Sequence, residues 1–222
     1  MRRAARMTTE ELAPWSWTAP PSPTDPAEKP GAIDWSAMFG NENPVEIEVG
    51  FGKGLFLVRA TGENPQVNYF GIEIEKKYQL YTATRLAKRQ RTNVKVTQAD
   101  ARALLKARVV SESVQAVHVY FPDPWWKKRH HKRRLFTEEF VQECERILKT
   151  EGQLHLATDV GEYFEVMREL LQSHPGLVEL PAPEEKEPDH DMDYLTNFER
   201  KARQQGKPIY RAIYRRSENA PG

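Results

Sequence analysis

The amino-acid sequence predicts an α/β protein with a mostly parallel, twisted sheet and helices on both of its faces. Short β-type runs follow one another from Val45 onward, and helical patterns separate most of them. A glycine-rich turn directly after the first run opens a helix, which is typical of a βαβ unit. We expect one domain over residues 33–216, with a flexible proline-rich extension over 1–32 and a flexible tail over 217–222.

The expected strands are short runs rich in β-branched and aromatic residues: VEIEV, NYFGIEI, VKVTQ, VQAVHVYF and GQLHLAT. A last run, IYRAIYRR at residues 209–216, predicts a final edge strand. Helical patterns cover residues 76–90 and 161–173. The clearest helix follows Phe136, where Thr137 is the expected N-cap, and its apolar stripe contains Phe140, Val141, Cys144, Ile147 and Leu148.

The first 32 residues contain six prolines and few aliphatic side chains. Such a composition cannot bury enough surface to offset the entropy of ordering the chain. We therefore expect this extension to be flexible, with only incidental contacts from Trp15 and Trp17.

Charge is balanced overall but strongly segregated along the chain. Lys and Arg number 33 against 32 Asp and Glu, yet residues 127–134 (KKRHHKRR) carry six fixed positive charges and residues 184–193 are acidic. The basic run predicts a phosphate-binding patch, because each neutralised phosphate releases counterions. The expected phosphate contacts are Lys128, Arg129, Lys132, Arg133 and Arg134; the alternative is a merely solvated loop.

Several residue types limit the possible functions. Cys144 is the only cysteine, which excludes an intrachain disulfide and suits a core position. His118 and His155 fall inside expected strands and are expected to be core residues, and no histidine pair has zinc-ligand spacing, so we expect no metal. No apolar run is long enough for a membrane span, and the N-terminus lacks a secretion signal, so a cytoplasmic location without a membrane partner is expected.

The glycine-rich turn, EVGFGKG, indicates nucleotide binding. Gly50, Gly52 and Gly54 allow positive φ angles and close approach of a ligand to the backbone. Their G-x-G-x-G spacing differs from the G-x-G-x-x-G of dinucleotide sites. Glu48 would repel a pyrophosphate, but it favours the cationic methionine end of S-adenosylmethionine.

Two further carboxylates follow the next two expected strands. Glu73 can accept hydrogen bonds from both ribose hydroxyls, a role that would equally suit NAD, and Asp100 can accept one from the adenine amino group. Because three acids end three successive strands beside a glycine turn, the pattern favours S-adenosylmethionine as the cofactor.

The fourth expected strand runs into a proline-stiffened turn, PDPWW, that contains Asp123. A carboxylate in this place can accept hydrogen bonds from both N1–H and N2–H of a guanine. Lys127 can approach the guanine O6 or a phosphate. The turn therefore suits recognition of a flat base at the rim of the cofactor site.

Six segments together resemble the bacterial tRNA (guanine-N7)-methyltransferase family over about residues 39–214: EVGFGKG, GIEIEKK, the aspartate of TQAD, FPDPWWKKRHHKRR, LATD and TNFERKA. The resemblance implies a Rossmann-like class I methyltransferase fold of about seven strands with an antiparallel C-terminal edge strand. It also implies transfer of a methyl group from S-adenosylmethionine to N7 of guanine 46 in the tRNA variable loop.

The resemblance also assigns roles to individual residues. Glu48, Glu73, Asp100 and Asp123, with the three glycines, would bind the cofactor, and Asp123 would also be the catalytic residue where cofactor and guanine meet. The substrate side would be formed by Lys127, Asp159, Thr196, Asn197, Phe198 and Glu199. Because N7 carries no proton, Asp123 is expected to orient the base and stabilise developing positive charge rather than act as a general base.

Two alternatives stay open on sequence grounds: an enzyme that methylates an exocyclic amine, and an RNA-binding module that has kept the fold without catalysis. The expected partner is tRNA. No obligate protein partner is indicated, and a monomer or a homodimer would fit.

Overall fold

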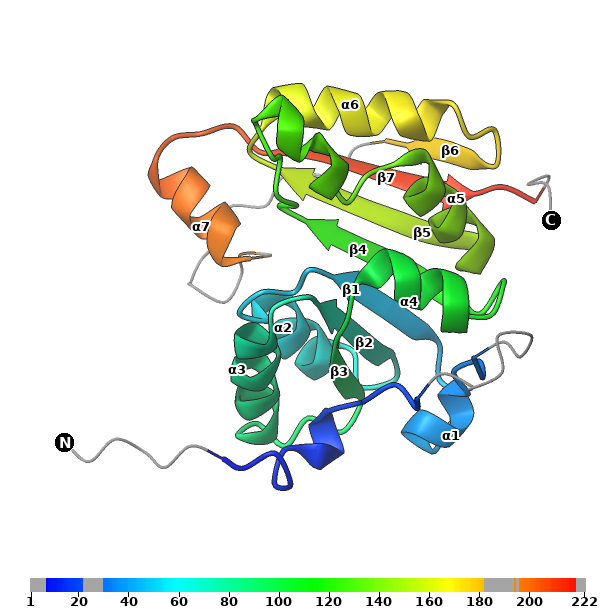
Figure 1. The fold of residues 1–222 in the computed structure, drawn as a ribbon, viewed down its shortest axis with the longest axis vertical. Coiled ribbons are helices and arrows are strands. Elements are labelled where there is room, and N and C mark those ends of the chain that lie inside the picture. Colours follow the sequence, from blue (N-terminus) through cyan, green and yellow to red (C-terminus); the bar gives the residue numbers. More distant parts are fainter. Residues whose placement is uncertain (1–6, 22–29, 182–193, 195, 219–222) are drawn as a thin grey trace.

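The computed structural model describes residues 7–21, 30–181, 194 and 196–218. It contains a seven-stranded sheet with the order β3-β2-β1-β4-β5-β7-β6 (Figure 1). Strands β1 to β5 are parallel, whereas β7 pairs antiparallel with both β5 and β6. The strands are β1 (Val45–Val49), β2 (Asn68–Glu73), β3 (Val94–Gln98), β4 (Val114–Tyr120), β5 (Leu148–Thr158), β6 (Leu177–Leu180) and β7 (Tyr210–Arg216). The predicted α/β class is confirmed.

Helices connect the strands and cover both faces of the sheet. They are α1 (Trp35–Phe39), α2 (Leu55–Glu63), α3 (Lys76–Ala87), α4 (Ala101–Arg108), α5 (Glu138–Ile147), α6 (Gly161–Gln172) and α7 (Asn197–Gln204), with short 3₁₀ helices η1 (Ala13–Trp15) and η2 (Lys128–Arg133). The Thr137 hydroxyl accepts the N–H of Phe140 at 3.2 Å, which confirms it as the N-cap of α5.

The C-terminal strand β7 is not the edge strand that the sequence predicts. β7 is antiparallel, as expected, but it lies inside the sheet between β5 and β6, and β6 forms the edge. β6 has only four residues, and its Val178 and Glu179 are exposed. A strand this short, with an exposed apolar residue, gives no alternating pattern that sequence analysis can detect.

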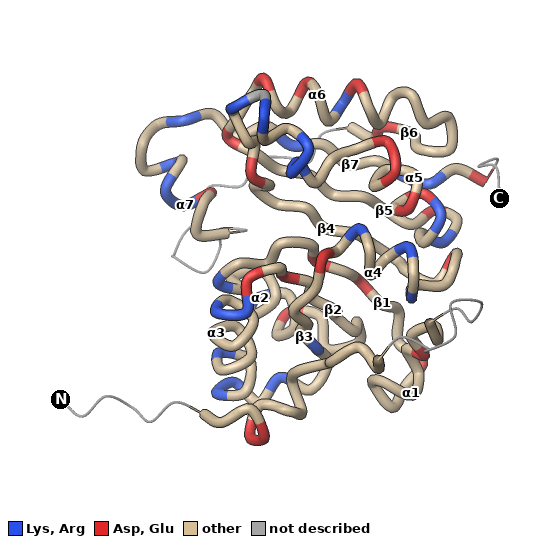
Figure 2. Tube along the Cα trace, in the orientation of Figure 1, with Lys and Arg blue, Asp and Glu red and all other residues tan. Residues whose placement is uncertain are grey.

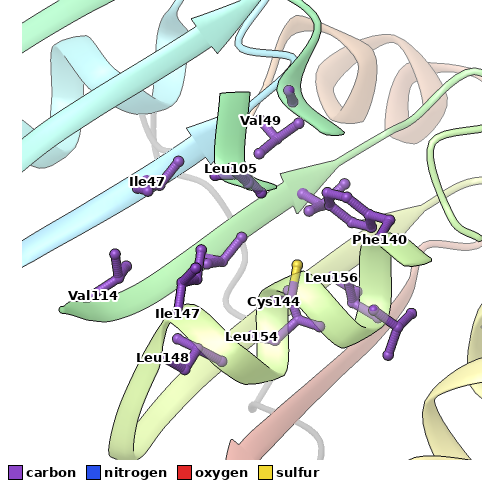
Figure 3. Close-up of a cluster of buried hydrophobic side chains, with 14 of the residues drawn as sticks. Ile47, Val49, Leu105, Val114, Phe140, Cys144, Ile147, Leu148, Leu154 and Leu156 are labelled. Carbon is purple, nitrogen blue, oxygen red and sulfur yellow. The ribbon is translucent and has the colours of Figure 1, made fainter. Parts of the chain in front are cut away.

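Two apolar cores lie on opposite faces of the sheet. The larger joins α4, α5 and α6 to the strands, and Figure 3 shows part of it around Phe140, Cys144 and Ile147. Cys144 is fully buried there, as predicted, and burial raises the pKa of its thiol. The smaller core joins α2 and α3 to the other face and includes Phe51, which comes from the glycine loop.

Residues 14–17, part of the extension expected to be flexible over 1–32, lie against the edge strand β3, while residues 1–6 and 22–29 lie outside the described part of the chain. The Trp17 N–H donates to the Val96 carbonyl at 3.0 Å, and Ser16 forms a parallel bridge with Val96. Leu12 is only 2% exposed within the smaller core, and Trp17 meets Phe70 edge to face. The segment therefore covers a sheet edge that would otherwise present unpaired backbone groups.

Candidate active site

The site lies where the strand order changes direction along the sheet. From β1 the chain moves outward to β2 and β3, then returns to place β4 on the other side of β1. Glu48 is in register with Gly71 of β2 and with His118 of β4, so the carboxyl ends of these strands lie side by side. In open α/β sheets, ligands bind at this kind of switch point.

The glycine loop after β1 is shaped for close approach of a ligand. Gly50 and Gly52 have φ angles of 78° and 51°, and a Cβ at either position would meet no atom within 4 Å. Gly54 has a different role, because its Cβ would clash with Thr82 of α3 at 2.2 Å. Two glycines thus face open space, while the third allows α2 to pack against α3.

Glu48 lies at the end of β1, and its side chain is almost completely enclosed. The residue is 1% exposed, and its Oε2 atom has no hydrogen-bond partner within the described part of the chain. Burial, together with the nearby negative charge of Glu73, raises the pKa of Glu48 well above its usual range. A buried carboxylate oxygen without a partner is costly, and a cationic or hydrogen-donating ligand would relieve that cost.

Glu73, at the end of β2, is held by backbone donors. Its Oε2 accepts the N–H of Gly52 at 2.9 Å, and its Oε1 accepts the N–H of Glu75 at 3.0 Å. The carboxylate therefore links β2 to the glycine loop, and one of its oxygens is already bonded to that loop.

Asp100 is the N-cap of α4. Its Oδ1 accepts the N–H of Arg102 at 3.0 Å, and its carboxylate pairs with the Arg102 guanidinium at 3.2 Å. Partial burial raises the pKa of Asp100, but the hydrogen bonds and positive charge of Arg102 outweigh burial and hold it below its usual range. The residue is exposed at the carboxyl end of β3, on the same sheet edge as Glu48 and Glu73.

The loop after β4 carries Asp123 on the rim of the switch point. Phe121 and Trp125 flank it with φ angles of 54° and 47°, in the left-handed region that non-glycine residues rarely adopt. Such conformations cost roughly 1–3 kcal/mol each and cluster at functional sites. Asp123 is exposed, as are Trp126 and Lys127 beyond it.

The basic run forms η2, and its charges divide into two sets. Arg129, Lys132 and Arg133 are exposed, and the Arg133 guanidinium also lies over the Trp125 ring at 5.1 Å. Arg134 donates from Nε to the Pro124 carbonyl at 2.8 Å and lies 4.9 Å from the Tyr163 ring centre. Lys128 begins η2. Figure 2 shows Lys and Arg positions in this segment, on α7 and along α3; the acidic run 184–193 lies outside the described residues.

Helix α7 approaches the same rim. Its N-cap is Thr196, which accepts the N–H groups of Phe198 and Glu199, both at 3.1 Å. Phe198 is 60% exposed, and its ring stacks on that of Phe121 with centroids 6.4 Å apart. Of the predicted substrate-side residues, Phe198 therefore lies beside the Asp123 loop.

Two other predicted substrate-side carboxylates have protein partners. Glu199 is buried and pairs with Arg203 at 3.0 Å and with Arg211 of β7. Asp159, just after β5, lies 3.4 Å from the Lys207 ammonium. These pairs connect α7 and the segment that follows it to the sheet. The remaining predicted residue of α7, Asn197, is the first residue of that helix.

A buried polar chain beside Glu48 was missed by sequence analysis. His118 Nε2 lies 2.9 Å from a Glu46 oxygen, and its Nδ1 lies 2.9 Å from the Tyr120 hydroxyl. Burial, followed by the negative charge of Glu48, raises the pKa of Tyr120. The sequence did contain a signal for this chain. Side chains two residues apart on a strand share a face, so Glu46 and Glu48 share one face of β1, and His118 and Tyr120 share one face of the neighbouring β4.

The other expected core histidine, His155, stacks on His118 with centroids 4.8 Å apart. Burial, followed by the charge of His118, lowers the pKa of His155 to about 3. His118 is 5% exposed, which confirms it as a core residue.

No described helix is long and apolar enough to cross a lipid bilayer.

Comparisons with solved structures give the same fold. The aminoglycoside-resistance methyltransferase NpmB1 matches with a TM-score of 0.55 at 18% identity, over 78% of this chain and 87% of that one. TrmN from Thermus thermophilus matches with a TM-score of 0.56 at 13% identity, over 82% of this chain and 46% of that one. At these identities the likeness shows a class I methyltransferase fold.

Comparisons of sequence are more specific. A family model described as "Putative methyltransferase" matches residues 42–212. A tRNA (guanine-N(7)-)-methyltransferase of Rhodopirellula baltica is 45% identical over 86% of this chain and 73% of its own length. One of Alkalilimnicola ehrlichii is 34% identical over 100% of this chain and 93% of its own length. The chain belongs to the tRNA (guanine-N7)-methyltransferase family.

Proposed function

We propose that this chain transfers the methyl group of S-adenosylmethionine to N7 of guanine 46 in the variable loop of tRNA. The main observation behind the proposal is that a glycine loop beside a buried carboxylate and an exposed loop followed by a basic run lie next to each other at the switch point of the sheet. A glycine loop with the buried Glu48 lies on one side, and the exposed loop of Asp123, followed by the basic η2, lies on the other.

The residues on the first side fit the cofactor. The unpartnered Oε2 of Glu48 suits the cationic methionine end, and the open space at Gly50 and Gly52 suits a ligand lying on the loop. Glu73 would accept hydrogen bonds from ribose hydroxyls, and Asp100 one from the adenine amino group. When bound, S-adenosylmethionine supplies the electrophilic methyl group.

Asp123 would orient the guanine and stabilise charge. A carboxylate can accept hydrogen bonds from N1–H and N2–H together, which fixes the plane and direction of the base. Methylation of N7 gives the purine a positive charge, and a fixed carboxylate stabilises that charge as it develops. No base is required, because N7 attacks with a lone pair and has no proton to lose.

The second side would bind RNA through charge and stacking. Exposed Arg129 and Lys132 can neutralise phosphates, and Lys127 can approach the guanine O6 or a phosphate. Trp126 and Phe198, 63% and 60% exposed, offer ring faces on which unpaired bases can stack. Exposed apolar rings beside exposed cations are typical of surfaces that bind single-stranded nucleotides.

The test is methyl transfer from labelled S-adenosylmethionine to an unmodified tRNA transcript, followed by nucleoside analysis and aniline cleavage. We expect N7-methylguanosine, with cleavage at position 46 and none in a transcript with adenosine there. A methylated exocyclic amine would instead support the alternative enzyme class. Binding of tRNA with neither cofactor binding nor methyl transfer would favour an RNA-binding module.

A further inference from the structure

Arg134, the last residue of the basic run, is half-buried and makes two contacts with the protein. Its Nε atom donates to the Pro124 carbonyl at 2.8 Å, and its guanidinium carbon lies 4.9 Å from the centre of the Tyr163 ring. Tyr163 belongs to α6 and is 1% exposed. The guanidinium therefore lies between the loop of Asp123 and the body of the fold.

The rest of the run folds back on the same loop. Arg133 lies over the Trp125 ring, and the His130 ring meets Trp125 edge to face with centroids 5.8 Å apart. Two residues after Arg134, Phe136 is buried against Phe140 in the larger core. The chain just after the run is thus anchored in the larger core, and side chains of the run itself contact the Trp125 ring of the loop.

The loop needs such support because its backbone is strained. Phe121 and Trp125 both have positive φ angles, on either side of Asp123, and strained residues persist only when surrounding contacts hold them. Burial raises the pKa of Tyr163, while the positive charge of Arg134 opposes that rise and the negative charge of Asp123 adds to it. Arg134 contacts both the loop and this ring.

We propose that Arg134 is a positioning residue: together with the ring of Tyr163, it holds the Asp123 loop in the conformation that methyl transfer needs, and it does not bind tRNA phosphate. The proposal rests on the proposed function for its catalytic consequence only. The basic run then has two tasks, since its outward charges bind RNA and its last arginine fixes the loop.

The test compares Arg134→Lys and Arg134→Ala with Arg129→Ala, an exposed arginine of the same run. Lysine keeps the charge but cannot combine the planar stacking with the directed Nε–H bond. We expect both Arg134 variants to raise amide hydrogen exchange by roughly tenfold in the protein without tRNA. The amides concerned are those of Phe121, Asp123, Trp125 and Trp126. Both should also lower the single-turnover rate at saturating tRNA, without changing the salt dependence of tRNA binding.

Arg129→Ala should do the reverse: it should reduce the log–log salt slope by roughly 0.7–0.9 and leave loop exchange unchanged. A second pair at Tyr163 separates the ring from its hydroxyl: Tyr163→Phe should match the wild type in loop exchange, and Tyr163→Leu should match Arg134→Lys. Thermal unfolding of each variant identifies any that is globally unfolded, and in that case the Tyr163 pair decides.

Unchanged loop exchange in Arg134→Ala, or a reduced salt slope that Arg134→Lys restores, would overturn the proposal and make Arg134 a phosphate contact. Absence of N7 methylation by the wild type would instead overturn the proposed function. The exchange comparison would still decide whether Arg134 fixes the loop, because it needs no substrate.

Discussion

The cofactor half of the site, formed by Glu48, Glu73, Asp100 and the glycine loop, differs sharply from the RNA half, formed by residues 121–134 and α7. In the cofactor half, the Glu48 and Glu73 carboxylates are buried at strand ends, and Glu73 is held by backbone N–H groups. In the RNA half, Asp123 and Lys127 are exposed on a loop flanked by strained residues.

The difference matches the two kinds of ligand. A small cofactor is held best by groups that rigid strands fix before it arrives, since little ordering is then required on binding. A large polyanion is bound by charges that stay hydrated until phosphates replace their counterions. Asp123 lies between the cofactor half and the RNA half. In the proposed function its carboxylate must be held in place, as in the cofactor half, and be accessible to tRNA, as in the RNA half.

The largest effect is expected where the two halves meet. Asp123→Asn keeps the shape and removes the charge, so the single-turnover rate should fall by about 10² to 10³, equivalent to roughly 2.7–4 kcal/mol. Calorimetry should show cofactor affinity changed by less than about threefold. Glu162→Gln, an exposed position in the first turn of nearby α6, serves as the charge-matched control. A similar loss of cofactor affinity in Asp123→Asn would show that the carboxylate belongs to the cofactor half.

Loss of packing beneath the glycine loop should have the next largest effect. Leu12 is buried in the same core as Phe51 of the glycine loop, so Leu12→Ala should lower the free energy of unfolding by about 2–4 kcal/mol. Denaturant titration measures the change, with Glu10→Ala at an exposed neighbouring position as the control. Unfolding of Leu12→Ala at the wild-type midpoint would mean that the N-terminal segment is free in solution.

Glu48→Gln should have opposite effects on stability and on binding. The raised pKa means that the fold disfavours the ionised carboxylate, so the wild type loses stability as pH rises through that pKa, whereas the variant does not. In acid, where the carboxyl group is protonated in both folded and unfolded chains, the difference should vanish.

At neutral pH the ligand-free variant should be more stable by about 1–3 kcal/mol, yet bind S-adenosylmethionine roughly tenfold to a hundredfold more weakly. Thermal unfolding across pH and calorimetry measure the two effects. A variant that is less stable than the wild type at neutral pH would show that Glu48 has a stabilising partner in the folded chain.

The smallest effect should come from a single charge of the RNA half. Lys132→Ala should reduce the log–log salt slope of tRNA binding by roughly 0.7–0.9, the value for one lost phosphate contact. Lys149, exposed at the start of β5, gives a matched control whose change to alanine should leave the slope unaltered. Equal slopes for both variants would place the RNA on another face.

The sequence alone was sufficient for the features that neighbouring residues encode. The glycine loop, the Thr137 cap and the helical stripe of α5 each depend on residues within a few positions of one another. Parallel strands ending in Glu48, Glu73 and the segment before Asp100 could also be predicted, because alternation and run length indicate strands and their carboxyl ends share one edge.

Only the tertiary structure decided three other features. β6 takes the sheet edge outside β7. Leu12 is buried in the smaller core, and Trp17 hydrogen-bonds to β3. Arg134 contacts Pro124 and the Tyr163 ring. Each depends on a partner distant in sequence, or on a sheet edge that exists only after the other strands have assembled. Composition and charge indicate how a segment behaves when it is isolated in water. The proline-rich segment becomes ordered because β3 offers it hydrogen-bond partners and an apolar surface, and Arg134 contacts the protein because the fold places a carbonyl and an aromatic ring beside it.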